Sequence, residues 1–321
     1  VSNIDCIQRM DSRRPLFRWL SDKWQHFRRR NSLQGSRKNI AAHYDLSNDF
    51  YQLFLDPSMM YSAAVFPDQC SDLDTAAEYK LQRICELLRL QPSDHLLEIG
   101  TGWGGMAIYA AQHYGCRVTT TTISAEQYRY AVDKVKSLGL QNQIDVLFED
   151  YRNLEGHYDK LVSIEMIEAV GHQYYRDYFS TINRLLKPDG LMAIQAITIP
   201  DQRYHRATRS VDFIQKYIFP GGCLPSIATM AQHIGRHSDM RIVRVDDIAS
   251  HYAKTLASWR RRFLDNQYAV QKLGFTEQFQ RMWEFYLAYC EGGFTERAIG
   301  TVQMVLEKPR GRADLLMLDN R

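Results

Sequence analysis

The chain has 321 residues, of which 45% are hydrophobic and 24% are charged. This composition excludes a disordered, collagen-like or disulfide-rich chain and is sufficient for one large or two small globular domains. No apolar run reaches the roughly 18 residues that a membrane-spanning helix needs, and no signal-peptide pattern opens the chain. The six cysteines lack the spacing of metal sites, which favours reduced thiols and a cytoplasmic protein.

Basic residues gather near the start of the chain. Nine Lys and Arg but a single acid lie between residues 13 and 38, whereas the remainder has 31 basic and 36 acidic residues. Apolar residues three or four apart share one face of a predicted helix there: Leu16, Leu20, Trp24 and Phe27. We therefore predict that residues 1–40 form a basic amphipathic arm that contacts an anionic membrane. Packing of this helix against its own domain stays open, and its apolar face argues against a nucleic-acid partner.

Downstream, the sequence alternates between strand and helix patterns. Residues 41–60 mix aromatic and polar residues and lead into a turn, and a helix is predicted over 75–90. Strands are then predicted at 96–100, 116–123, 144–150, 158–166 and 191–199, with helices at 106–114, 126–138 and 174–186. This order predicts an α/β domain over 41–310 with a mostly parallel sheet and helices on both faces. Strands at 241–248 and 301–309 bring the sheet to seven, the last as an antiparallel edge, and 311–321 form a tail.

The region from about 200 to 290 interrupts this alternation. It combines a turn-rich apolar segment with a long helical stretch that is unusually rich in aromatic residues. Such aromatic helices are typical of an ordinary core, but their density also suits a long apolar pocket. Both interpretations stay open from the sequence alone.

The segment Leu96–Gly105 carries the clearest ligand-binding pattern. It runs from an apolar strand through an acid into a turn with three glycines, which let the backbone turn sharply and approach a ligand closely. A dinucleotide site would place an acid about 20 residues further on, where this chain has threonines. Glu98 instead precedes the glycines, and Asp150 ends the third strand. This arrangement favours S-adenosylmethionine, with Glu98 near its methionine part and Asp150 near its adenine.

Several separate motifs, all in one order, give the chain a family resemblance. They are HYDLSNDFY (43–51), DPSMMYS (56–62), EIGTGWGG (98–105), TISAEQ (122–127), EDYR (149–152), EMIEAVG (165–171) and KYIFPGGCLPS (216–226). Between about residues 40 and 309 the chain resembles the cyclopropane-fatty-acyl-phospholipid synthases, which are S-adenosylmethionine-dependent lipid methyltransferases related to mycolic acid cyclopropane synthases.

The resemblance implies a fold, an activity and a location. The fold would be a class I S-adenosylmethionine-dependent methyltransferase (Rossmann-like) sheet with helical insertions that form a lipid pocket. The activity would be transfer of a methylene or methyl group to the double bond of unsaturated phospholipid acyl chains, giving cyclopropane fatty acids. The enzyme would lie on the inner face of the cell membrane as a peripheral protein, without nucleic acid, and a homodimer is compatible with the resemblance.

The resemblance also assigns residues to the cofactor, to catalysis and to the acyl chain. The implied cofactor contacts are Tyr61, Ser62, Glu98, Gly100, Thr101, Gly102, Trp103, Gly104, Thr122, Ile123, Ser124, Gln127, Asp150 and Tyr151. The implied catalytic residues are Glu168, Tyr252, Gln195 and Cys290, and the implied substrate pocket includes Ala63, Ile197, His172, Tyr217 and Phe219. A base must remove a proton after methyl transfer, and in this family a bound bicarbonate ion is implied as that base.

Two positions depart from the family pattern. Ala63 stands where a cysteine is usual, and Gln195 stands where a histidine is expected. Gln195 can donate a hydrogen bond but cannot titrate, so retention of bicarbonate stays open, with His172 as a substitute for the missing histidine. Glu168 also has an alternative role as a structural acid. Without bicarbonate the product would be a methylene- or methyl-branched chain, and a small-molecule N-methyltransferase or a non-catalytic lipid-binding homologue remain alternatives.

Overall fold

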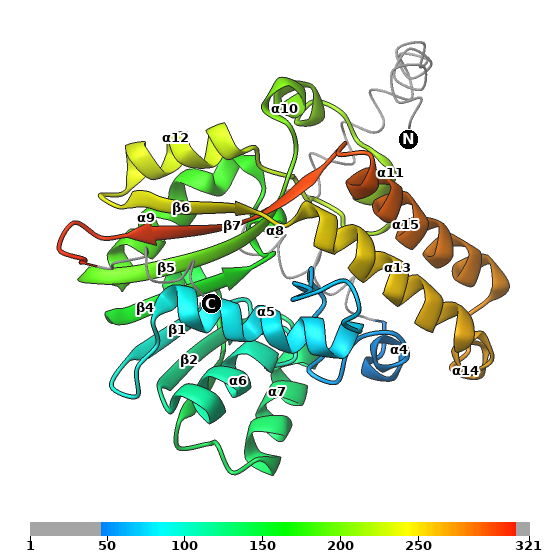
Figure 1. The fold of residues 1–321 in the computed structure, drawn as a ribbon, viewed down its shortest axis with the longest axis horizontal. Helices are drawn as coiled ribbons and strands as arrows, with labels where there is room; N and C mark the ends of the chain where they lie inside the picture. The colour runs from blue at the N-terminus through cyan, green and yellow to red at the C-terminus, as the bar shows by residue number, and fades with distance from the viewer. Residues whose placement is uncertain (1–45, 313–321) are drawn as a thin grey trace.

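The computed structural model describes residues 46–312, which form a seven-stranded sheet with the strand order β3-β2-β1-β4-β5-β7-β6 (Figure 1). The strands are β1 (His95–Ile99), β2 (Arg117–Thr122), β3 (Ile144–Phe148), β4 (Tyr158–Ile164), β5 (Leu186–Thr198), β6 (Arg241–Asp247) and β7 (Gly300–Glu307). Strands β1 to β5 pair in parallel, and β7 pairs antiparallel with both β5 and β6. All seven predicted strands are present, but the prediction that the last strand is an edge is wrong, because β7 lies between β5 and β6.

The four helices predicted with bounds, at 75–90, 106–114, 126–138 and 174–186, begin and end close to those residues. The described helices are α4 (Asn48–Gln52), α5 (Leu73–Leu88), α6 (Gly105–Tyr114), α7 (Ala125–Ser137), α8 (Ile167–Val170), α9 (Tyr175–Leu185), α10 (Asp201–Ala207), α11 (Phe213–Tyr217), α12 (Ile227–His237), α13 (Ala249–Asp265), α14 (Gln267–Lys272) and α15 (Glu277–Thr295). Side chains cap several of them: Asp72, Ser124 and Thr276 each accept a hydrogen bond from a first-turn backbone amide.

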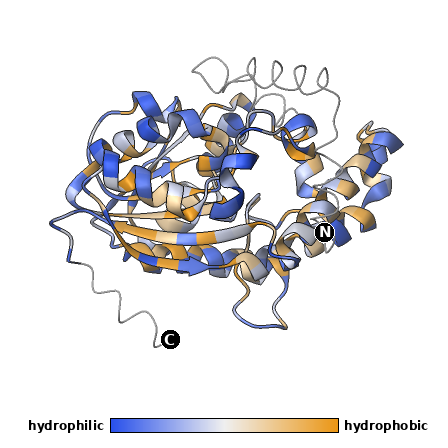
Figure 2. Cartoon of the chain, turned by 90° about the horizontal axis from the view of Figure 1, so that it is seen from above, coloured by the Kyte–Doolittle hydropathy of each residue, from blue (hydrophilic) through white to orange (hydrophobic). Residues whose placement is uncertain are grey.

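The two faces of the sheet bury different residues of the same strands. On β5, Leu191 and Ala193 pack with α5 and α6, whereas Met192 and Ile194 pack with α9 and α12 on the opposite face. This alternation follows from the two-residue period of a strand. Figure 2 shows apolar residues concentrated along the sheet, with polar residues on the outward sides of the helices.

A third apolar cluster lies beyond the carboxyl ends of the parallel strands. There α13 and α15 run side by side and pack with α4 (Figure 1). The ring of Phe50 on α4 meets those of Phe263 and Trp283 edge-on, with centroids 6.2 and 5.1 Å away. Most of the aromatic residues predicted around 255–290 are therefore core of this helical layer, although Tyr268 and Phe285 are 70% and 53% exposed.

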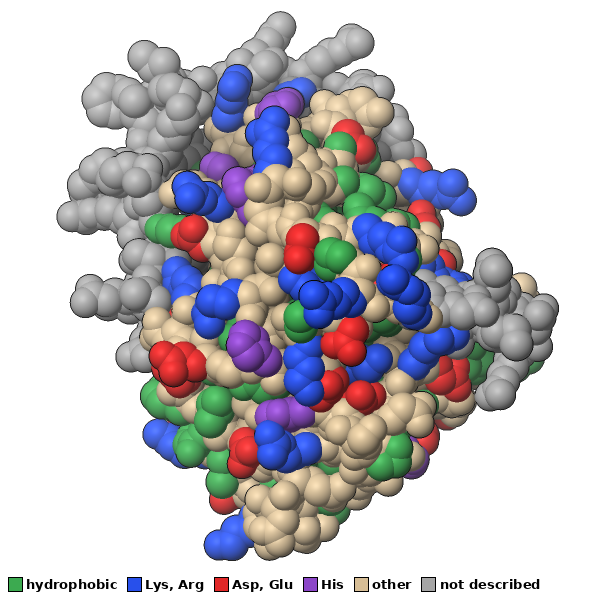
Figure 3. Space-filling view, turned by 90° about the vertical axis from the view of Figure 1, so that its left-hand side faces the viewer, with side chains coloured by type: hydrophobic (Ala, Val, Ile, Leu, Met, Phe, Trp, Pro, Cys, Tyr) green, Lys and Arg blue, Asp and Glu red, His purple; other side chains and the backbone are tan. Residues whose placement is uncertain are grey.

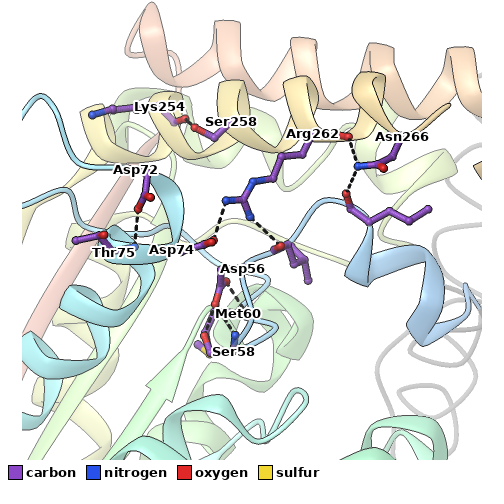
Figure 4. A network of polar contacts seen from close by, with 12 residues as sticks. Asp56, Ser58, Met60, Asp72, Asp74, Thr75, Lys254, Ser258, Arg262 and Asn266 are labelled. Carbon is purple, nitrogen blue, oxygen red and sulfur yellow. Dashed lines mark hydrogen bonds and ion pairs between the residues drawn. The ribbon is translucent and has the colours of Figure 1, made fainter. Parts of the chain in front are cut away.

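Polar contacts fix this helical layer to the chain that precedes the sheet (Figure 4). Arg262 on α13 donates to the side chain of Asp74 (2.8 Å) and to the carbonyl of Leu55 (3.0 Å). Asn266 donates to the carbonyl of Leu53 at 3.0 Å. The buried Asp56 side chain accepts a hydrogen bond from the backbone amide of residue 58, which shapes the turn that follows. These bonds set the path of the chain towards residues 61–63.

The opposite end of the sheet carries a mixture of charges. Figure 3 views this end and shows Lys and Arg side chains interspersed with Asp and Glu. In the part of the chain that the structure describes, no helix has both the length and the apolarity needed to cross a membrane. The predicted arm (1–40) lies outside the described residues, as does most of the predicted tail (311–321).

Candidate active site

The glycine-rich turn joins β1 to α6 at the carboxyl end of the sheet. Gly100, Gly102 and Gly104 have φ angles of 100°, 52° and 91°, which side-chain-bearing residues rarely adopt. A side chain at Gly100 would also meet the side chain of Met166 at 3.3 Å, whereas a Cβ on Gly102 would face open space. Because Gly104 caps α6 without a side chain, the first amides of α6 are not blocked by a capping group. The turn thus offers backbone amides to a ligand.

Glu98 supports this turn from within the sheet. Its side chain is 3% exposed and accepts a hydrogen bond from the Thr120 hydroxyl at 2.6 Å. The Thr120 hydroxyl in turn pairs with that of Thr101 in the turn at 2.7 Å. Burial raises the pKa of Glu98 to about 8. Glu98 therefore lies beneath the turn and connects to it through Thr120 and Thr101, and its contact with the cofactor stays a prediction.

Further predicted cofactor residues lie at the ends of β2 and β3, beside the turn. The Thr122 hydroxyl donates to the side-chain oxygen of Gln127 (2.9 Å), and Ser124 caps α7. Asp150 is buried and binds the guanidinium of Arg152 through Nε (2.8 Å) and Nη2 (2.6 Å). The fold thus brings these predicted residues to one edge of the sheet, as the switch-point rule for α/β folds requires.

Two more predicted cofactor residues contact neighbouring side chains, and a third lies at the end of β2. The indole of Trp103 donates to Asn48 at 2.7 Å, and the ring of Tyr151 meets that of Tyr178 edge-on. Ile123 follows β2 and remains partly accessible.

Tyr61 and Ser62 reach the site from the segment before α5. The Tyr61 hydroxyl pairs with that of Tyr286 on α15 at 2.9 Å. The Ser62 hydroxyl accepts a hydrogen bond from the ammonium group of Lys80 at 2.8 Å. Lys80 is fully buried, and burial lowers its pKa to about 8 against the opposing charges of Asp56, Glu165 and Glu98. This lysine was not predicted, because it stands on the buried face of α5 where the pattern leads one to expect an apolar residue.

Glu165 is the centre of the polar cluster, and the sequence analysis missed it. Its Oε1 accepts hydrogen bonds from the backbone amide of Ala63 and from Nε2 of Gln195, both at 2.9 Å. Its Oε2 accepts one from the Tyr252 hydroxyl at 2.7 Å. Gln195 and Tyr252, assigned to catalysis beside Glu168, therefore both bind Glu165 instead. An acid directly after a parallel strand was the signal that could have identified it.

Glu168 lies three residues further on, in α8. One of its oxygens accepts a hydrogen bond from the backbone amide of Ile197, so the predicted backbone contact of Ile197 is made to this carboxyl group. The other oxygen, Oε2, has no hydrogen-bond partner among the described residues. Burial, together with the charge of Glu165, raises the pKa of Glu168 to about 8. Near neutral pH Glu168 is therefore mostly protonated.

A series of hydrogen-bonded side chains orients the Gln195 amide. Nε2 donates to the carbonyl of Ala63 (3.1 Å) as well as to Glu165, and Oε1 accepts from Nε2 of Gln303 on β7 (2.9 Å). Oε1 of Gln303 accepts in turn from Nε of Arg83 on α5 at 2.8 Å. Neither Gln303 nor Arg83 was predicted.

The other predicted residues have mixed positions. Phe219 packs against the rings of Tyr61 and Tyr286, with centroids 6.3 and 6.2 Å away. Tyr217 is 57% exposed, so the prediction that it lines an interior pocket does not fit its position. His172 begins the short turn after α8. Burial raises the pKa of Cys290 far above its usual value, so this thiol stays protonated and is not an activated nucleophile.

Comparisons with known proteins agree on one family. Residues 31–304 match the family described as mycolic acid cyclopropane synthetase. The chain is 42% identical over 283 residues to the tuberculostearic acid methyltransferase UfaA1 of Mycobacterium tuberculosis, covering 86% of this chain and 66% of that protein. It is 38% identical over 267 residues to the cyclopropane-fatty-acyl-phospholipid synthase of Escherichia coli, covering 83% and 66%. The chain therefore spans just under two thirds of the length of these two relatives.

Solved structures show the same fold. The mycolic acid cyclopropane synthase CmaA1, complexed with SAH and CTAB, superimposes with a TM-score of 0.79 and 32% identity, covering 85% of this chain and 98% of that one. A coclaurine N-methyltransferase at 19% identity and a TM-score of 0.71 shows the fold alone. The seven-stranded sheet is that of class I S-adenosylmethionine-dependent methyltransferases. Together, the family match, the curated relatives and the CmaA1 structure show that this chain belongs to the mycolic acid cyclopropane synthetase family.

Proposed function

We propose that this protein transfers a one-carbon unit from S-adenosylmethionine to the double bond of an unsaturated fatty acyl chain. The observation that carries the proposal is a pair of carboxyl groups, Glu165 and Glu168, set beside the glycine-rich turn and under an aromatic helical layer. The names of two relatives, a tuberculostearic acid methyltransferase and a cyclopropane-fatty-acyl-phospholipid synthase, support a lipid substrate.

The residues at the carboxyl ends of β1 to β3 fit S-adenosylmethionine. The open space at Gly102 and the uncapped start of α6 suit close approach of a ligand to the backbone. The partly accessible residues Ile123 and Tyr151 would flank it on the same edge of the sheet. When bound, S-adenosylmethionine supplies a methyl group attached to a positively charged sulfur. The part of this chain is to hold that group near the acyl chain.

The aromatic side chains nearby would keep water away from the reacting carbons. An alkene that accepts a methyl group becomes a carbocation, which water would quench. Tyr61 packs against Trp259 and Phe219, with ring centroids 5.3 and 6.3 Å away, so the segment entering the site is enclosed by rings. Aromatic faces and a nearby carboxylate both stabilise positive charge.

The finer product is also part of the proposal. A cyclopropane is the product that the resemblance implies, and a methylene- or methyl-branched chain is the alternative that the tuberculostearic acid relative favours. The bicarbonate expectation fits the residues poorly. Gln195, Tyr252 and the backbone amide of Ala63, which would hold such an anion, already bind the carboxylate of Glu165. We therefore assign bicarbonate no step.

Phospholipid as the acyl carrier, peripheral membrane association and a homodimer are proposals as well. Exposed aromatic residues on the helical layer, including Tyr217 and Phe285, support contact with a lipid surface. An amine substrate is the second candidate within the fold, but its structural support is a likeness at 19% identity, which carries no substrate.

The decisive experiment uses the purified protein with methyl-labelled S-adenosylmethionine and vesicles of a monounsaturated phospholipid. Mass spectrometry should show acyl chains heavier by one CH₂, and ozonolysis should show whether their double bond is lost or retained. Saturated phospholipid is the control and should gain no label. Absence of label from the unsaturated chains, with S-adenosylhomocysteine binding intact, would contradict the proposed function.

A further inference from the structure

We propose that Glu165 is the base of the reaction, so that this protein carries its own carboxylate where an added anion would otherwise be needed. The inference rests on the proposed function and concerns the proton-transfer step. It is carried by the hydrogen bonds around Glu165, by the charges beside it and by its backbone conformation.

The carboxylate of Glu165 is held by donors from three separate parts of the fold. The amide of Ala63 comes from the segment before α5, Nε2 of Gln195 from β5 and the Tyr252 hydroxyl from α13. Two donors bind Oε1 and one binds Oε2. A carboxylate has about four acceptor sites, so Oε2 keeps a site to which no described residue donates. That site can take a proton.

Glu165 and Glu168 also differ from the groups that hold them in being partly accessible. Both glutamates keep some exposed surface, whereas Gln195 and Tyr252 are buried, at 1% and 6% exposed. The part of the cluster that remains open therefore lies at residues 165 and 168, although Oε2 of Glu168 is itself enclosed. This is the arrangement expected of groups that face a reacting molecule.

The charges around the pair favour different protonation states. Burial raises the pKa of Glu165, while its three hydrogen bonds and the ammonium of Lys80 oppose that rise. Glu168 has a single hydrogen-bond donor among the described residues, and the charge of Glu165 adds to its burial, which raises its pKa to about 8. When the environment separates the pKa values of two neighbouring carboxyl groups in this way, one acts as a base and the other stays neutral. The three hydrogen-bond donors stabilise the charged form of Glu165 and favour it as the base.

The backbone supports the same assignment. Glu165 has a φ of 49°, in the left-handed region that non-glycine residues seldom occupy. Its amide donates to the carbonyl of Gln195 at 2.7 Å, so backbone and side chain are both tied to that residue. Strained residues of this kind persist where the surrounding structure holds them, and they cluster at functional sites.

The proposed step balances. Addition of the methyl group to one alkene carbon uses the π electrons and leaves a positive charge on the neighbouring carbon, while the donor sulfur keeps the old bonding pair. Glu165 then removes a proton from the added methyl group, and that C–H pair bonds to the cationic carbon and closes a three-membered ring. If a hydride first shifts from the methyl-bearing carbon to the cationic carbon, the same pair forms a methylene double bond. Neither route needs an oxidant or reductant.

The first test compares the wild type with Glu165→Gln and with Glu165→Gly in the vesicle assay, in buffer freed of carbon dioxide. The wild type should keep its full rate, and Glu165→Gln should lose at least about a hundredfold, the usual contribution of a general base. Added formate or acetate should restore part of the rate of Glu165→Gly. Glu155→Gln, a change at an exposed surface carboxylate, is the matched control. A wild-type rate that requires added bicarbonate would overturn the inference while leaving the proposed function intact.

The second test does not depend on turnover. Hexadecyltrimethylammonium places a fixed positive charge on a long chain, whereas hexadecanol is a neutral probe with a chain of the same length. Glu165→Gln should weaken binding of the cation about tenfold and leave hexadecanol unchanged, as measured by calorimetry in the presence of S-adenosylhomocysteine. Equal losses for both probes, or loss of S-adenosylhomocysteine binding, would mean that Glu165 is merely structural.

Discussion

Replacing Glu168 by glutamine should make the stability of the protein less dependent on pH. The carboxyl group has a pKa of about 8 in the folded protein, against 4.5 for the unperturbed group. Between these values the folded protein keeps a proton that the unfolded chain has released, so the free energy of unfolding falls as pH rises. The fall is about 1.4 kcal/mol for each pH unit, or roughly 3 kcal/mol between pH 4.5 and pH 7. Solvent at the accessible part of the side chain makes this value a ceiling.

Glutamine has the shape of the protonated acid but cannot ionise, so Glu168→Gln and the wild type should have similar stability near about pH 5. At about pH 8 the variant should be more stable by up to roughly 3 kcal/mol. Urea unfolding followed by tryptophan fluorescence at several pH values measures this difference, with Glu155→Gln as the exposed control. A difference between variant and wild type that stays constant across this range would refute the reasoning.

Four further changes test other parts of the structure. Gly100→Ala introduces a side chain at a position of positive φ and should weaken S-adenosylhomocysteine binding roughly tenfold, as measured by calorimetry. Unchanged affinity would contradict the requirement for glycine at this position of the turn. Lys80→Met removes a positive charge near Glu165 and should therefore raise the pKa of Glu165. The acid limb of the pH–rate profile should then move to higher pH, and an unmoved limb would exclude an effect of Lys80 on Glu165. Gln303→Leu leaves a buried amide oxygen without its donor and should lower stability by about 1–3 kcal/mol in urea unfolding and reduce turnover. Deletion of residues 1–38 should weaken sedimentation with anionic vesicles, and undiminished binding would refute the membrane-contacting arm.

Local sequence patterns were sufficient for the strands and for the glycine-rich turn between β1 and α6. The strand, acid, glycine turn and helix of residues 96–114 follow one another along the chain, so their geometry depends on near neighbours. Glu165 was missed because its partners are distant in sequence: Ala63 lies 102 residues away and Tyr252 lies 87 away. Their convergence depends on how α13 and the segment before α5 pack over the sheet, which no local pattern reveals.

The order of the last strands shows the same limit and one usable clue. Nearly every residue of β7 is buried, whereas β6 is exposed along much of its length. The apolar residues Met304, Val305 and Leu306 follow one another and so lie on both faces of β7, a pattern that favours an interior strand. Position at the end of the chain is a poor guide to position in an antiparallel pair, because a hairpin-like return can insert the last strand between two earlier ones.

Through its contact with Gln195, Gln303 on the C-terminal strand β7 determines which end of the Gln195 amide faces the site. A glutamine amide is positive at one end and negative at the other, and its shape is almost unchanged when the two ends exchange places. The nitrogen of Gln303 meets the oxygen of Gln195, which leaves the nitrogen of Gln195 to face the carboxylate. Arg83 fixes the first amide in the same way. A single reversal along this relay would place an amide oxygen against the carboxylate of Glu165, so the orientation of Gln303 and Arg83 decides whether Gln195 attracts or repels that carboxylate.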